Sequence, residues 1–181
     1  MKSKLTRFKE EYLIQLGRIV VNMNKLEFYT SSSIFLLTSE HHTISQQYYI
    51  LMSVIGNQRF GRIIQALDTV FKTKVDDSRL IKKFNSLKDK ANSLYNKRNT
   101  YVHSMWLFAE DDTFVSRMKN LKFPKVETQY QPTVKELSSF ADELQSCAGE
   151  LMSFIHDVTI RLERKSAMKS LQPNQALKLT E

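Results

Sequence analysis

Apolar residues recur at intervals of three and four along most of the chain, which is the period of an amphipathic α-helix. The first stretch predicts a long helix over residues 7–39 with two apolar rows. The first row contains Leu13, Leu16, Val20, Met23, Ile34 and Leu37, and the second contains Tyr12, Ile19 and Leu26. The first row passes through Glu27 and Thr30, so we expect a carboxylate on the buried seam of this helix.

The same spacing predicts four further helices, over residues 45–54, 59–72, 78–102 and 133–164. Two of them carry start signals. The Asp76-Asp77-Ser78 sequence is typical of a helix N-terminus, because short polar side chains there accept hydrogen bonds from free backbone N–H groups. Thr133 and Glu136 have the spacing of a capping box, in which each side chain bonds the backbone N–H of the other.

One charged residue interrupts the apolar seam of the helix over 78–102. The seam consists of Leu80, Phe84, Leu87, Ala91 and Leu94. Its next position is Arg98, and Tyr101 and Val102 follow. A buried arginine needs a partner, and the carboxylate on the first helix, Glu27, is the best one available by pattern.

The helical spacing ends after His103. Two apolar stretches, 106–108 and 113–115, flank an acidic turn and predict a short β-hairpin. Residues 116–132 are expected to form a loop before the last helix.

The scarcity of chain-breaking residues supports a helical protein. The 181 residues include four Gly and three Pro, and all three prolines lie in the last third of the chain. We therefore predict an all-α bundle of four to five helices, two of them long, with a short hairpin after residue 103. A single domain is expected over residues 1–165, and residues 166–181, which lack sustained periodicity, are expected to form a mobile tail.

Cysteine and histidine content argues against several kinds of site. Cys147 is the only cysteine, which excludes an intrachain disulfide and a Cys-based zinc site. The adjacent His41 and His42 have no third ligand nearby in sequence, so we expect no metal and no cofactor. The N-terminal sequence lacks the apolar stretch of a signal peptide, and no apolar run reaches the ~20 residues of a membrane span. These features favour a soluble, cytoplasmic protein without a membrane partner.

Positive charge is concentrated in one part of the chain. The net charge is +8, and residues 72–98 alone carry nine basic and three acidic residues. Such a stripe is typical of proteins that bind a polyanion such as RNA, and Lys88, Lys90 and Lys97 are the candidate RNA-binding residues. A solvated lysine-rich helix face remains the alternative, because no aromatic residues are interleaved at stacking intervals.

The end of the helix over 78–102 brings together residue types suited to phosphodiester cleavage. Arg98 offers a planar fork of donors for phosphate oxygens, and His103 can accept or donate a proton near neutral pH. Asn99 and Tyr95 lie on the same helix face as His103, and Asn99 can orient the imidazole or donate to the phosphate. Arg98 and His103 are five residues apart, about 140° around an ideal helix. They converge only if the helix ends or distorts between them, or if two copies face each other.

The string Arg98-Asn99-Thr100-Tyr101-Val102-His103 resembles the R-x4-6-H motif of the HEPN superfamily, in which a polar residue follows the arginine. The resemblance implies a homodimer whose two motifs form one composite cleft, and metal-independent endoribonuclease activity that leaves a 2′,3′-cyclic phosphate. It implies that Arg98 binds the phosphate, that His103 is the acid and base, and that Asn99 supports them. From the helix pattern, Glu27 is expected to hold Arg98, and Tyr95 either lines the cleft or merely packs. Related roles include toxin–antitoxin systems, phage defence and RNA processing, with an antitoxin or regulatory protein as a further partner. Met105 stands where some toxin members carry a modifiable tyrosine.

Two other hypotheses fit the same residues. In the first, the chain is a non-catalytic HEPN-like module that binds nucleotide, RNA or a protein partner. In the second, it is a helical interaction protein in which Arg98 and Glu27 form a structural ion pair. The two HEPN-type hypotheses predict that Arg98 and His103 of both chains gather in one basic cleft. The hypothesis of a helical interaction protein predicts that His103 points into packing or bulk solvent.

Overall fold

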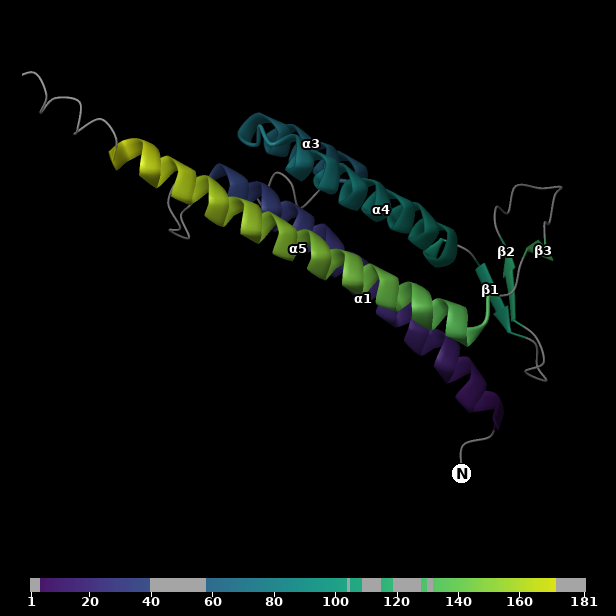
Figure 1. Ribbon diagram of the computed structural model, residues 1–181. Coiled ribbons are helices and arrows are strands. Elements are labelled where there is room, and N and C mark those ends of the chain that lie inside the picture. The colour runs from purple at the N-terminus through teal and green to yellow at the C-terminus, as the bar shows by residue number, and fades with distance from the viewer. Residues whose placement is uncertain are drawn as a thin grey trace, which may run out of the picture. The chain divides into compact units, whose positions relative to one another are not determined.

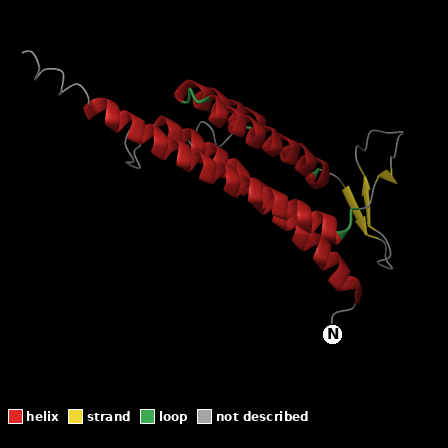
Figure 2. Cartoon of the chain, in the orientation of Figure 1, coloured by secondary structure: helices red, strands yellow, loops and turns green. Residues whose placement is uncertain are grey.

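The computed structural model describes residues 4–39, 58–103, 105–108, 115–118, 128–129 and 132–171. Within this part the chain forms four helices and three short strands (Figures 1 and 2). The helices are α1 (Lys4–Thr38), α3 (Phe60–Lys74), α4 (Ser78–Val102) and α5 (Val134–Leu171). The strands are β1 (Met105–Phe108), β2 (Val115–Met118) and β3 (Thr128–Gln129). The predicted all-α class with two long helices is confirmed, since α1 has 35 residues and α5 has 38.

The chain divides into two compact units, whose boundaries fall inside α1, α4 and α5. The first, which we call the motif unit, combines Met1–Phe28 with Lys88–Ala148 and contains residues 98–103. The second unit combines Tyr29–Leu87 with Gly149–Glu181. Each unit has its own buried core of apolar side chains.

In the motif unit, α1 and α5 run in the same direction (Figure 1). The buried Tyr12 hydroxyl of α1 donates to the Pro132 carbonyl at 3.0 Å, just before α5 begins. Ten residues further along α1, the Asn22 side-chain amide donates to the Ala141 carbonyl at 2.9 Å. Arg18 reaches the Asp142 carboxylate at 2.6 Å. Because α1 and α5 run parallel, positions that advance along α1 face positions that advance along the segment of α5. The side chains of Tyr12 and Asn22 therefore reach backbone carbonyls of that segment in the same order.

The second unit is built around stacked aromatic rings. Phe71 of α3 and Phe84 of α4 stack with centroids 4.2 Å apart, and Phe154 of α5 lies 5.8 Å from Phe71. The buried face of α3 is the one that the spacing predicts: Phe60, Ile63, Ile64, Leu67 and Phe71. Asp77 caps α4 as expected, because its carboxylate accepts the backbone N–H groups of Arg79 and Leu80.

The buried side of α1 differs from the prediction in its first half. The second apolar row is the buried one there, with Tyr12 at 6% and Ile19 and Leu26 at 0% exposure. Leu13, the start of the predicted seam, is 58% exposed, and Leu16 and Val20 are only partly buried. Both rows have helical spacing, and spacing alone cannot decide which one a neighbouring helix covers.

The region after α4 also departs from the prediction. The expected hairpin is present as β1 and β2, which pair antiparallel with Met105 opposite Met118 and Phe108 opposite Val115. The expected loop over 116–132 is wrong in part, because β2 extends to Met118 and β3 pairs with it.

The last helix is longer than expected, since α5 continues seven residues beyond Arg164 to Leu171. Residues 163–168 are exposed and still helical, so the loss of the apolar row did not mark the end of α5. The predicted helix over 45–54, the His41-His42 pair and residues 172–181 lie outside the described residues. None of the described helices combines the length and apolar character needed to cross a membrane.

Candidate functional site

Arg98 continues the buried seam of α4, as its spacing predicts. The residues that precede it on this face, Phe84, Leu87, Ala91 and Leu94, are all buried, and Arg98 itself is half-buried. Its Nη1 donates to the Asn99 side-chain oxygen at 3.0 Å. Its Nε is buried and has no hydrogen-bond partner among the described residues. The guanidinium therefore holds one desolvated donor that has no acceptor among the described residues.

Glu27 of α1 lies within electrostatic reach of Arg98. Burial raises the pKa of the Glu27 carboxyl, and the positive charge of Arg98 lowers that pKa by a smaller amount. The net result is a carboxyl whose pKa lies above its ordinary value of 4.5. The two charges that sequence spacing places on facing seams are thus coupled in the structure.

His103 is exposed and follows the last residue of α4. Its backbone N–H still donates to the Asn99 carbonyl at 3.1 Å, the bond that a continuing α-helix makes. The helix therefore neither breaks nor distorts between Arg98 and His103, and their side chains leave the axis about 140° apart. Within one chain the motif does not gather Arg98 and His103 around one point.

Tyr95 and Asn99 are half-buried and lie on the same side of α4 as His103. Along this side of α4, the half-buried side chains of Tyr95 and Asn99 are followed by the exposed imidazole of His103. Asn99 is the link between the two halves of the motif, because its oxygen accepts from Arg98 and its backbone carbonyl accepts from His103.

The three candidate RNA-binding lysines have different surroundings. Lys97 lies over the ring of Phe140 at 4.6 Å and 3.9 Å from the Glu143 carboxylate, so it also packs α4 against α5. Lys88 is half-buried, and Lys90 is exposed. Lys90 and Lys97 are thus the two exposed lysines of the three.

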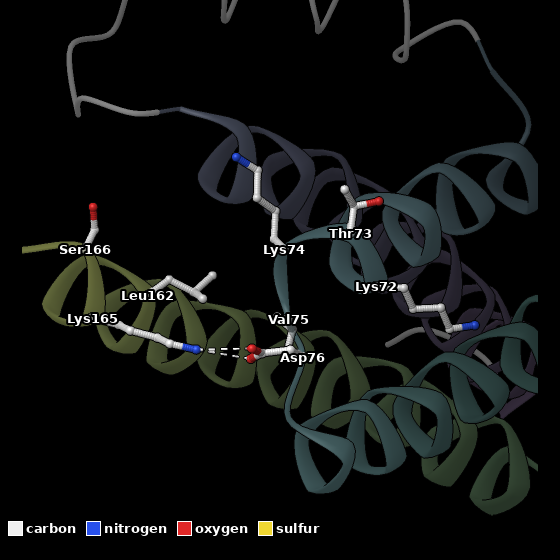
Figure 3. A pocket seen from close by; sticks show the side chains of 8 residues that line it. All are labelled: Lys72, Thr73, Lys74, Val75, Asp76, Leu162, Lys165 and Ser166. Atoms are coloured by element: carbon white, nitrogen blue, oxygen red, sulfur yellow. Dashed lines mark hydrogen bonds and ion pairs between the residues drawn. The ribbon is translucent and has the colours of Figure 1, made fainter. Parts of the chain in front are cut away.

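A separate cavity of about 380 Å³ lies in the second unit (Figure 3). It is lined by Lys72, Thr73, Lys74, Val75, Asp76, Leu162, Lys165 and Ser166. Figure 3 shows Lys165 reaching across to Asp76, and the ion pair is 3.2 Å long and largely exposed. None of the predicted site residues lines this cavity. Its lining residues form no motif with a recognisable spacing, and one of them, Ser166, lies in the segment expected to be a tail, through which α5 continues.

No group of three or more His, Cys, Asp or Glu side chains within the described residues could hold a metal ion. The lone cysteine, Cys147, is fully buried in the core of the motif unit. No protein-family model, curated protein sequence or solved structure matches the chain.

Proposed function

We propose that this protein is a metal-independent endoribonuclease of the HEPN type that acts as a homodimer. The observation that carries the proposal is the environment of Arg98, a half-buried arginine with a desolvated Nε, one donor held by Asn99 and the half-buried Glu27 carboxyl within electrostatic reach. A guanidinium oriented in this way can use its remaining donors on a phosphate.

The reaction uses the ribose 2′-hydroxyl as nucleophile. A His103 imidazole accepts the 2′-hydroxyl proton as the 2′-oxygen attacks phosphorus, and Arg98 stabilises the charge on the phosphate oxygens. The bond from phosphorus to the 5′-oxygen breaks, and an imidazolium returns a proton to that oxygen. The products are a 2′,3′-cyclic phosphate and a 5′-hydroxyl. The divergence of Arg98 and His103 on one helix is the reason why the proposal needs two copies, with the His103 of one facing the Arg98 of the other.

The test is cleavage of end-labelled RNA in EDTA by wild type and by His103→Ala protein, purified identically. Wild type is expected to cut RNA and to leave a cyclic phosphate, whereas His103→Ala should lose at least about 100-fold in rate, the contribution of one acid–base group. DNA of the same sequence should resist, because it lacks the 2′-hydroxyl.

His156→Ala is the matched control, because His156 is an exposed histidine on α5 in the second unit. It should cut RNA as fast as wild type. Equal cleavage by wild type and His103→Ala would identify a contaminating nuclease and contradict the proposal. Specific RNA binding without cleavage would favour the non-catalytic module, whereas the exposed position of His103 is also what the helical interaction protein predicts.

A further inference from the structure

α1 has a second apolar face, opposite the one packed in the core of the motif unit. Its members are Leu13, Ile14, Val21 and Phe28, with exposures of 58%, 57%, 54% and 49%. We call these four residues the α1 stripe. Steps of 100° per residue place the stripe on the side of the helix away from the buried row of Tyr12, Ile19 and Leu26. A helix that is apolar on two opposite sides is suited to packing on both.

The stripe has the regularity of a helix-pairing surface. Ile14, Val21 and Phe28 are spaced by seven residues, so they form one line along the helix. Gly17 lies between the first two, and a Cβ there would meet nothing within 4 Å. A second helix can therefore approach the α1 backbone closely at Gly17. The exposed Asn24 lies seven residues after Gly17, beside the line, and is a polar position of the kind that fixes register between paired helices.

We propose that the α1 stripe is the contact between two copies of this chain, with their α1 helices antiparallel. Four half-exposed large side chains present on the order of 400 Å² of apolar surface, as large as the main patch of a typical monomer. A standard interface buries about 800 Å² per partner, so polar side chains flanking the stripe complete the contact. In a two-fold symmetric pair, the same surface of each copy contacts the other copy. One continuous apolar line on α1 can form such a contact with itself.

The position of Arg98 favours a second copy of the chain as the partner, with the two α1 helices antiparallel. Leu13, Val20 and Glu27 are also spaced by seven and mark one edge of the stripe, and Glu27 is the residue coupled to Arg98. In an antiparallel pair the matching edges of the two helices lie on the same side of the seam, whereas in a parallel pair they lie on opposite sides. Antiparallel pairing therefore brings the Arg98 residues of both copies to one side of the dimer. The contact follows from the stripe, whereas its antiparallel direction and its link to catalysis rest on the proposed function.

The first test is sedimentation of Val21→Lys and Ile14→Lys proteins at micromolar concentration. Wild type is expected to be a dimer, and each variant should raise the dimer dissociation constant by about 100-fold or more, because both copies lose an apolar contact and gain a like charge. Met168→Lys is the matched control, since Met168 is a 64% exposed apolar residue on α5 outside the stripe. It should leave the dimer intact. A monomeric wild type, or dimers that persist in both stripe variants, would overturn the proposal.

Cysteine cross-linking tests the direction of pairing. Val21→Cys lies near the middle of the stripe and should form an interchain disulfide under mild oxidation. Ile14→Cys should not, because antiparallel pairing about this midpoint places it opposite Phe28. Efficient cross-linking through Ile14→Cys would indicate parallel helices and overturn the arrangement. RNA cleavage by a monomeric Val21→Lys protein would contradict the composite site of the proposed function while leaving the α1 dimer contact supported.

Discussion

Arg98 is a charged residue on the otherwise apolar seam of α4, and its charge determines which groups must lie beside it. An aliphatic residue at this position would complete the row that runs from Phe84 to Leu94. The arginine instead leaves a desolvated Nε in the protein interior and needs a carboxyl nearby. Glu27 supplies that carboxyl, and its pKa is raised. Burial disfavours the charged form of Glu27 more than the positive charge of Arg98 favours it.

The raised pKa of Glu27 predicts a pH dependence of stability. The folded protein holds the Glu27 proton more tightly than the unfolded chain does, so the stabilisation from this proton is present below the ordinary pKa of 4.5 and is lost as pH rises through the raised pKa. We expect Glu27→Gln protein, which has no such titration, to lose less unfolding free energy than wild type between about pH 4.5 and neutral pH. Urea denaturation across this range measures the difference.

Asp157→Asn is the control for that comparison, because Asp157 is an exposed carboxylate on α5. Its pH profile should parallel that of wild type. If the profiles of wild type and Glu27→Gln run parallel instead, the Glu27 proton does not contribute to folding stability.

The sequence located the candidate site but not its geometry. Spacing placed Arg98 and Glu27 on facing seams, and the structure couples them electrostatically. The direction of His103 depended on whether α4 ended before it, and the backbone bond to Asn99 that decides this has no signature in residue type. The roles of Arg98, Asn99 and His103 in catalysis remain predictions.

At the scale of elements, start signals were the most reliable guide. Thr133 and Glu136 form the predicted capping box, with the Glu136 N–H donating to the Thr133 hydroxyl at 3.2 Å and the Thr133 N–H donating to the Glu136 carboxylate at 2.7 Å. We expect Thr133→Ala to lower the unfolding free energy by about 1 kcal/mol, because N-terminal N–H groups of α5 lose their acceptor. Chemical denaturation of wild type and variant provides the measurement.

Ser139→Ala is the matched change for this prediction, since Ser139 is exposed within the same helix. Alanine favours the helix interior, so this substitution should leave stability unchanged or raise it slightly. Equal effects of the two substitutions would mean that the capping box contributes nothing to the stability of α5.

Apolar rows predicted the faces of the helices only where a helix carries a single row. α3 and α5 bury the residues that their spacing indicates, including Leu137, Leu144 and Leu151 of α5. α1 carries two rows, and in its first half the structure buries the one that was expected to be secondary, whereas Met23, Ile34 and Leu37 of the first row are buried further along. The third strand, β3, was missed because two paired residues are too few to produce an alternating pattern.

For the whole molecule, the distribution of charge predicts how RNA binding responds to salt. The net charge is +8, and much of the excess lies on residues 72–98. Each lysine that contacts a phosphate releases a counterion, so the logarithm of the RNA association constant falls linearly with the logarithm of salt concentration. We expect Lys90→Gln, at an exposed position of α4, to reduce the magnitude of this slope by about 0.7, the value for one phosphate contact on a single strand.

Lys165→Gln separates a local contact from the effect of net charge. It removes the same single charge but lies in the second unit, where Lys165 is paired with Asp76. Because counterion release counts phosphates in contact and not the total charge, Lys165→Gln should keep the wild-type slope while Lys90→Gln does not. Fluorescence anisotropy of a labelled RNA over a salt series measures both slopes. Equal reductions would show that the RNA responds to overall charge, and the assignment of Lys90 to the RNA-binding surface would then be wrong.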